Sequence, residues 1–367
     1  MNTDLEEPKN VNSPEPDEPE GLDQQSLNLG AFPIDSLMIR TETRSVFEVC
    51  RRIDSNQYVM DPDFQRQFVW GVDRQSKLIE SALLRIPLPV FYLAETSDGK
   101  VVVVDGLQRL TTFHRYLNGQ FSLRDLAFAK DLNGAKFKDL DSSLKNRLED
   151  TQLTLYLIDS KVPDEAKYEI FERVNGGVPL TRQQMRNCLY VGEATRWLGR
   201  MADHSDFLEA TARSLNWKTM RDRECINRFA GFHVRGAKQY GGDMEDFLNL
   251  ALKGMNDGCD FERLSTDFLK SMRINKAVFG RHAFRKSIGD GHSRSVINVA
   301  LFDVFSTEFA AWPEDVAKAR AQEIRQATRT MLDNYDFLEA ISRSTNSTRN
   351  VKTRFQFVEN HIRPLLP

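Results

Sequence analysis

The strongest constraint on the fold is the stretch Val101-Val102-Val103-Val104-Asp105-Gly106, in which four consecutive valines precede an Asp-Gly pair. Four β-branched residues in a row cannot form one apolar and one polar face, so we expect a short strand buried on both faces. Gly106 ends the strand, because glycine adopts backbone angles that other residues avoid. Apolar residues at 110, 113 and 117 then follow with helical spacing. The stretch predicts a strand, a glycine turn and a helix.

The turn at Gly106 is a candidate anion site. The first turn of a helix has backbone N–H groups without intrahelical partners, and such groups bind phosphate readily. Arg109 falls in that turn, where the helix dipole favours an acidic side chain. Two interpretations fit the local sequence equally well. Either Arg109 contacts a phosphate, or it pairs with a nearby carboxylate in a purely structural turn.

Composition indicates an ordinary globular protein, with 28% charged and 40% hydrophobic residues. No apolar run approaches the roughly 18 residues that a membrane-spanning helix needs, and the N-terminus lacks the apolar segment of a secretory signal. The four cysteines are scattered without a CxxC motif, which is typical of a reducing compartment. We therefore expect a cytoplasmic protein without a membrane partner.

Charge is distributed unevenly along the chain. Residues 1–35 carry nine Asp and Glu against one lysine, whereas the remainder carries 49 Lys and Arg against 44 Asp and Glu. Residues 1–30 are also poor in apolar side chains, so we expect them to be a disordered acidic tail. The mildly basic remainder is compatible with nucleotide or nucleic acid binding.

Hydrophobic patterns divide the rest of the chain near residue 180. Residues 31–180 mix helices with strands: a helix over 73–84 precedes strands over 90–94, 101–104 and 153–158. Thr181 and Gln184 match a capping box, which predicts a helix from Arg182. Apolar stripes at helical spacing recur to the C-terminus. We expect an α+β chain, with a small mixed-sheet domain over 31–180 and a mostly helical domain over 181–367.

Two further segments contain polar side chains that their local structure does not require. Gln65 and Arg66 lie among large aromatic residues, where an arginine needs a partner or a ligand. Arg173 and Asn175 precede a glycine pair at a helix end, and ending a helix requires neither a guanidinium nor an amide.

Four blocks of the N-terminal half resemble one protein family, known as domain of unknown function 262. This family forms the N-terminal part of GmrSD-type modification-dependent restriction systems and is related to the ParB/sulfiredoxin fold. The resemblance rests on the order and spacing of the blocks over about 150 residues, since each block alone is weak. They are Phe64-Gln65-Arg66-Gln67-Phe68-Val69-Trp70, Leu78-Ile79-Glu80-Ser81-Ala82-Leu83-Leu84 with Pro87-Leu88-Pro89, Asp105-Gly106-Leu107-Gln108-Arg109, and Ile170-Phe171-Glu172-Arg173-Val174-Asn175-Gly176-Gly177 with Leu180-Thr181.

The resemblance implies a ParB/sulfiredoxin-like N-terminal domain that binds a nucleotide in a bacterial or phage-related restriction or antiphage system. We expect that ligand to be a nucleoside triphosphate with Mg²⁺. The third block departs from the family's D-G-Q-Q-R pattern at Leu107, which removes one amide and keeps the glycine and the arginine. The expected nucleotide-binding residues are Gln65, Arg66, Trp70, Asp105, Gly106, Gln108, Arg109, Arg173, Asn175 and Gly177.

Hydrolysis is a separate hypothesis from binding. The Gly-Lys-Ser/Thr ending of a P-loop is absent. Candidate catalytic groups are Asp105, as a base or Mg²⁺ ligand, and Gln108, which would orient a phosphate oxygen or water. Slow turnover and switch-like binding are equally compatible with this set. The six histidines are scattered without a nuclease-like metal constellation, so we expect any nuclease of the system to be a separate partner protein.

The competing hypothesis is a non-catalytic DNA-binding or regulatory ParB-like module. Seven Lys and Arg fall between residues 270 and 294, and Arg343, Arg349, Lys352 and Arg354 form a second basic group. On helices such residues usually form a solvated face, which is the favoured interpretation here. If they bind DNA instead, affinity falls steeply with salt.

Overall fold

The computed structural model describes residues 19–21, 38–60, 70–96, 99–163, 166–167, 170, 181–288 and 293–366. The chain forms two compact units, Gln25–Thr195 and Arg196–Pro367, and Met1–Gln24 belongs to the second. This division lies later in the chain than the predicted boundary at residue 180. In the described part of the chain, no helix is both long enough and apolar enough to cross a membrane.

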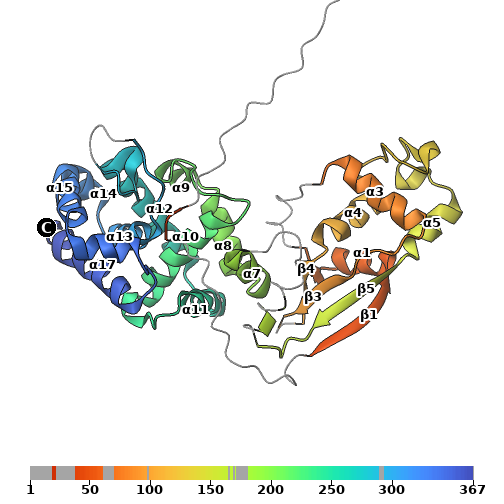
Figure 1. Cartoon of the computed structure of the whole chain (residues 1–367), viewed down its shortest axis with the longest axis horizontal. Coiled ribbons are helices and arrows are strands. Elements are labelled where there is room, and N and C mark those ends of the chain that lie inside the picture. The colour runs from red at the N-terminus through yellow and green to blue at the C-terminus, as the bar shows by residue number, and fades with distance from the viewer. Residues whose placement is uncertain are drawn as a thin grey trace, which may run out of the picture. The chain divides into compact units, whose positions relative to one another are not determined.

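The first unit is built on a five-stranded mixed sheet (Figure 1). The strand order is β1-β5-β3-β4-β2; β1 with β5 and β3 with β4 are antiparallel, whereas β5 with β3 and β4 with β2 are parallel. The small mixed sheet expected from the sequence is confirmed. The strands are β1 Ile39–Ser45, β2 Tyr58–Val59, β3 Phe91–Glu95, β4 Val101–Asp105 and β5 Gln152–Ile158.

Helices cover both faces of this sheet. The first core contains Val101 and Val103 of β4 with α1, α3, α4 and α5, and the second contains Val102 and Val104 with residues of α7. The valine strand is therefore buried on both faces, as its sequence predicts. The helical elements of this unit are α1 Val46–Asp54, α3 Val72–Leu83, α4 Leu107–Leu117, η2 Lys130–Leu132, η3 Phe137–Asp139, α5 Ser142–Glu149 and α7 Arg182–Leu189.

Local capping sets two of these helix starts. Ser45 caps α1, since its side chain accepts a hydrogen bond from the Glu48 backbone. Thr181 and Gln184 form the predicted capping box at the start of α7. The helix end around Arg173 and Asn175 and the aromatic residues around Gln65 and Arg66 lie outside the described residues.

The second unit is mostly helical, as the apolar stripes predict. Its core is rich in aromatic pairs; Phe268 packs on Phe207 and Phe229 with ring centroids 5.8 and 4.9 Å apart. Helix α8 crosses the division between the units. The elements are α8 Glu193–Ala202, α9 Ser205–Ala210, α10 Arg221–Ala230, η4 Gly231–Arg235, η5 Ala237–Gln239, α11 Met244–Asp257, α12 Phe261–Phe279, η6 Gly280–His282, α13 Val299–Ala310, α14 Glu314–Ala319, α15 Ala321–Leu332, α16 Tyr335–Ser342, α17 Thr348–His361 and η7 Arg363–Leu365.

Residues 19–21 of the expected acidic tail are attached to the helical unit. Glu20 forms a β-bridge with Asn298 at the start of α13, and its carboxylate accepts hydrogen bonds from Lys286 and Asn298. The expectation of disorder over 1–30 is therefore wrong at these three residues. Their backbone and carboxylate partners outweigh the poor apolar content of the segment.

Candidate functional site

The glycine turn connects β4 to α4 in the way that the sequence predicts. Gly106 is the N-cap of α4 with φ +98°, a left-handed conformation that favours glycine. A β-carbon on Gly106 would lie 2.3 Å from the ring of Phe91, the first residue of β3. Because Gly106 has no side chain, nothing on the N-cap covers the first-turn N–H groups of α4. The turn therefore presents backbone donors of the type that bind anions.

Arg109 is held beside this turn by several interactions. Its guanidinium lies 4.2 Å from the centroid of the Phe91 ring, within cation–π range. Its Nη2 donates to Asp105 Oδ2 at 2.9 Å and to the Val90 carbonyl at 3.0 Å, and its Nη1 donates to the Pro89 carbonyl. The guanidinium is thus fixed in place without a bound ligand being required.

Burial shapes the electrostatics of this pair. The Arg109 side chain is 12% exposed and that of Asp105 is 35% exposed. Desolvation lowers the pKa of Arg109 from its ordinary value, and the charge of Asp105 and its hydrogen bond oppose that shift. The ion pair between Arg109 and Asp105 is the one that the structural interpretation expects. It lies beside the start of α4, where the phosphate interpretation places the anion.

The other described residues of the predicted site take different positions. Gln108 is half-buried in the first turn of α4 and is engaged in contacts of its own. Trp70 is half-buried before α3, with the Arg74 guanidinium 4.5 Å from its ring centroid. Leu107, the departure from the family pattern, packs partly buried against the first core. Its apolar side chain therefore has a structural use at the start of α4.

Half of the expected binding set falls outside the described residues: Gln65, Arg66, Arg173, Asn175 and Gly177. The structure thus brings together Asp105, Gly106, Gln108 and Arg109.

Sequence reasoning missed the role of the β3 entry. Phe91 both limits the space at Gly106 and lies under the Arg109 guanidinium, and the carbonyls of Pro89 and Val90 hold the same guanidinium. The sequence does show an aromatic residue, Phe91, at the start of the strand that a short hairpin connects to the valine strand. Without the strand order of the sheet, however, its contact with the Gly106 turn could not be predicted.

Comparison with known families covers this part of the chain. Residues 46–191 match the family model for the GmrSD restriction endonuclease N-terminal domain. This segment is a GmrSD-type N-terminal domain. No curated protein and no solved structure matched the chain.

A metal ion in the GmrSD-type domain would need a cluster of donor side chains. In the described part of the chain, no group of three or more His, Cys, Asp or Glu is arranged to hold a metal ion. At the β4–α4 turn, the nearby carboxylate of Asp105 is paired with Arg109. Any Mg²⁺ at this turn would depend on phosphate oxygens for most of its ligands.

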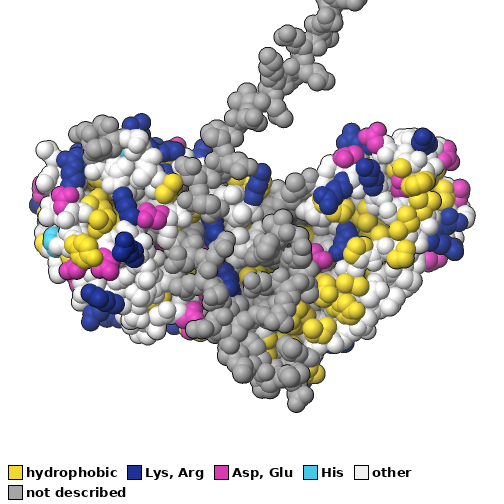
Figure 2. Space-filling view, in the orientation of Figure 1, with side chains coloured by type: hydrophobic (Ala, Val, Ile, Leu, Met, Phe, Trp, Pro, Cys, Tyr) yellow, Lys and Arg dark blue, Asp and Glu magenta, His cyan; other side chains and the backbone are white. Residues whose placement is uncertain are grey.

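The basic groups beyond the GmrSD-type domain do not form one solvated face. Arg285 and Arg354 are fully buried, and Arg354 bonds Asp303. Others pair on the surface: Lys276 with Glu209, and Arg273 with Asp206 and Glu314. On the face of the helical unit in Figure 2, Lys and Arg lie interspersed with Asp and Glu. The expectation of a solvated face is therefore wrong for Arg285 and Arg354, and neither is accessible to DNA.

Proposed function

We propose that this protein is a nucleoside-triphosphate-binding module of a restriction system, with the phosphates held at the β4–α4 turn. The description of the matched family supplies the restriction context. A separate nuclease would then cut DNA in response to the state of this module.

One observation carries the proposal. Gly106, forced to be glycine by its φ of +98° and by the Phe91 ring, places an uncapped helix start next to a fixed guanidinium. Backbone donors and the helix dipole favour an anion there, and Arg109 adds charge-assisted hydrogen bonds. Because Arg109 is held by the carbonyls of Pro89 and Val90, little side-chain entropy is lost when it binds phosphate.

Mg²⁺, when bound with the nucleotide, would neutralise phosphate charge. Asp105 is the described carboxylate closest in sequence to the turn, and it would have to leave Arg109 to reach a metal. If the bound triphosphate is hydrolysed, Asp105 and Gln108 are the groups of the turn able to orient a water. We propose slow hydrolysis, since this small polar set lacks the lysine of a P-loop.

Titration of the full chain with each of the four labelled nucleoside triphosphates, with Mg²⁺ present, tests the binding. We expect at least one to bind, and Arg109→Gln to weaken its affinity at least ten-fold. Arg115→Gln is the matched control, because it removes the same charge from the last turn of the same helix. Failure of all four to bind the wild-type protein, or equal loss in both variants, would refute the proposal.

A further inference from the structure

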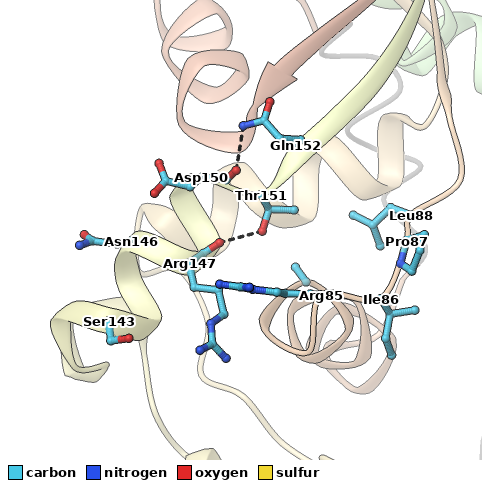
Figure 3. Close-up of a pocket in the computed structure, with 11 residues that line it drawn as sticks. Arg85, Ile86, Pro87, Leu88, Ser143, Asn146, Arg147, Asp150, Thr151 and Gln152 are labelled. Atoms are coloured by element: carbon cyan, nitrogen blue, oxygen red, sulfur yellow. Dashed lines mark hydrogen bonds between the residues drawn. The ribbon is translucent and has the colours of Figure 1, made fainter.

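A pocket of about 630 Å³ lies in the GmrSD-type domain, where the end of α3 faces the end of α5 and the start of β5 (Figure 3). Its volume falls in the range of small-molecule sites. Its lining includes two arginines, the apolar residues Ile86 and Leu88, the neutral polar residues Ser143 and Asn146, and one carboxylate, that of Asp150. Arg85 comes from the end of α3 and Arg147 from α5.

Arg85 occupies a backbone position that favours glycine. Its φ is +58°, directly after Leu84 caps α3. The Arg85 N–H bonds the Ala82 carbonyl and the Ile86 N–H bonds the Ser81 carbonyl, which is the Schellman pattern. Glycine is the usual residue at this point, because a β-carbon is disfavoured in the left-handed region. Because Arg85 keeps this strained position and lines a pocket, we expect its side chain to have a role there.

Neither guanidinium of the pocket is neutralised by a carboxylate within the described residues. Arg147 donates to the Leu83 carbonyl at 3.2 Å, which orients it at the end of α3. The Arg85 side chain is exposed and has no hydrogen bond or ion pair to any described residue. Asp150 also lines the pocket without forming an ion pair to either arginine. The two guanidinium groups outnumber the one carboxylate, so the pocket carries a net positive charge that an anion would balance.

We propose that this pocket binds the phosphate group of a small ligand of about mononucleotide size, at a site separate from the β4–α4 turn. Guanidinium groups present paired donors that match the oxygens of a phosphate. Ile86 and Leu88 provide apolar surface for the body of the ligand, and Ser143 and Asn146 provide hydrogen-bonding groups for its polar edges. Neither the matched family description nor the proposed triphosphate site includes these residues.

Equilibrium dialysis of the full chain with the four labelled nucleoside 5′-monophosphates, and with the matching nucleosides, tests the inference. We expect at least one monophosphate to bind and its nucleoside to bind at least ten-fold more weakly. The double variant Arg85→Gly with Arg147→Gln should lose at least ten-fold in affinity. Arg124→Gln is the matched control, because it removes an arginine charge near the other end of α3. The Arg124 backbone N–H donates to the side chain of Ser76, in the N-terminal half of that helix.

Two further measurements distinguish a loss of ligand binding at this pocket from a loss of folding and from an effect at the β4–α4 turn. Arg85→Gly alone should lose ligand affinity while its melting temperature is unchanged or raised, because glycine suits its backbone. Arg109→Gln should retain monophosphate binding, so that failure of the triphosphate proposal leaves this one standing. The inference is overturned if no monophosphate binds, if the double variant binds as tightly as wild type, or if nucleosides bind equally well.

Discussion

The Nη2 atom of Arg109 lies 2.9 Å from Oδ2 of Asp105, so one ion pair spans the glycine turn between β4 and α4. A phosphate bound at the start of α4 would compete with the Asp105 carboxylate for this guanidinium. The pair therefore determines how available Arg109 is to an anion. The structural interpretation and the phosphate-binding interpretation of the turn therefore predict different effects of an Asp105 substitution on anion binding.

Asp105→Asn should strengthen binding of a nucleoside triphosphate. The variant removes the competing negative charge and keeps a side chain of the same size. A partly exposed ion pair contributes about 0.2–1 kcal/mol, so the gain should be no more than about five-fold. Titration with and without Mg²⁺ measures it, with Asp54→Asn, which removes the partner of His114 in the same domain, as control. Weaker binding confined to Mg²⁺-containing buffer would instead assign Asp105 to the metal.

Gly106→Ala should destabilise the GmrSD-type domain far more than Gly99→Ala. Both glycines have positive φ, +98° and +79°, and each alanine meets a left-handed penalty of about 1–2 kcal/mol. At Gly106 the new β-carbon also collides with the buried Phe91 ring, which adds about 1–3 kcal/mol, whereas nothing lies within 4 Å at Gly99. Urea unfolding of both variants makes the comparison. Equal losses would show that the Phe91 ring moves aside freely.

Local sequence predicted the elements whose cause is local. The valine strand and the Thr181 capping box depend on neighbouring residues, and the structure contains both of them. Phe91 could not be assigned to the turn from sequence, because its contact with Gly106 depends on the pairing of β3 with β4.

Charged residues were the least predictable from sequence. Arg354 follows a pattern that suits a solvated helix, and yet it is fully buried against Asp303, 51 residues away in the chain. The position of Glu20 is similarly remote from its partners Lys286 and Asn298. Such pairings depend on the tertiary fold, and local composition alone favoured exposure for the arginine and disorder for the glutamate.

Asp303→Asn should unfold or severely weaken the helical unit. The Asp303 carboxylate is fully buried and accepts hydrogen bonds from Arg228 at 2.8 and 2.6 Å and from Arg354 at 2.7 Å. Removing its charge leaves two buried guanidinium groups uncompensated, for a loss of about 3–5 kcal/mol. Urea unfolding followed by tryptophan fluorescence measures the loss. Glu209→Gln, which breaks an exposed pair with Lys276, is the control and should leave the midpoint unchanged; a wild-type midpoint for Asp303→Asn would contradict the prediction.

Arg85→Gly should stabilise the GmrSD-type domain, although it removes a large side chain. The φ of +58° at Arg85 is relieved by glycine, and the gain after subtracting the entropy of the unfolded glycine is about 0.5–1 kcal/mol. For a unit of this size that corresponds to a rise in melting temperature of roughly 1–4 °C. Arg85→Ala is the control, since it deletes the guanidinium and keeps the β-carbon. A matching rise in Arg85→Ala would attribute the effect to charge rather than to backbone strain.

Asp222→Asn should change how the stability of the helical unit depends on pH. Burial raises the pKa of Asp222 to about 6, from an ordinary value of 3.8. Between these values the unfolded chain loses the proton before the folded protein does, so the contribution of Asp222 to stability falls as the pH rises from about 4 to 6. The total loss is up to about 3 kcal/mol.

Asparagine carries no such charge and can still accept the hydrogen bond from the Arg223 backbone N–H. The free energy of unfolding in urea, measured at several pH values, should therefore favour the variant increasingly up to about pH 6 and remain constant above it. Asp257→Asn, which removes an exposed carboxylate at the end of α11, is the control for the loss of one negative charge. A difference between Asp222→Asn and wild type that does not change with pH would contradict the prediction.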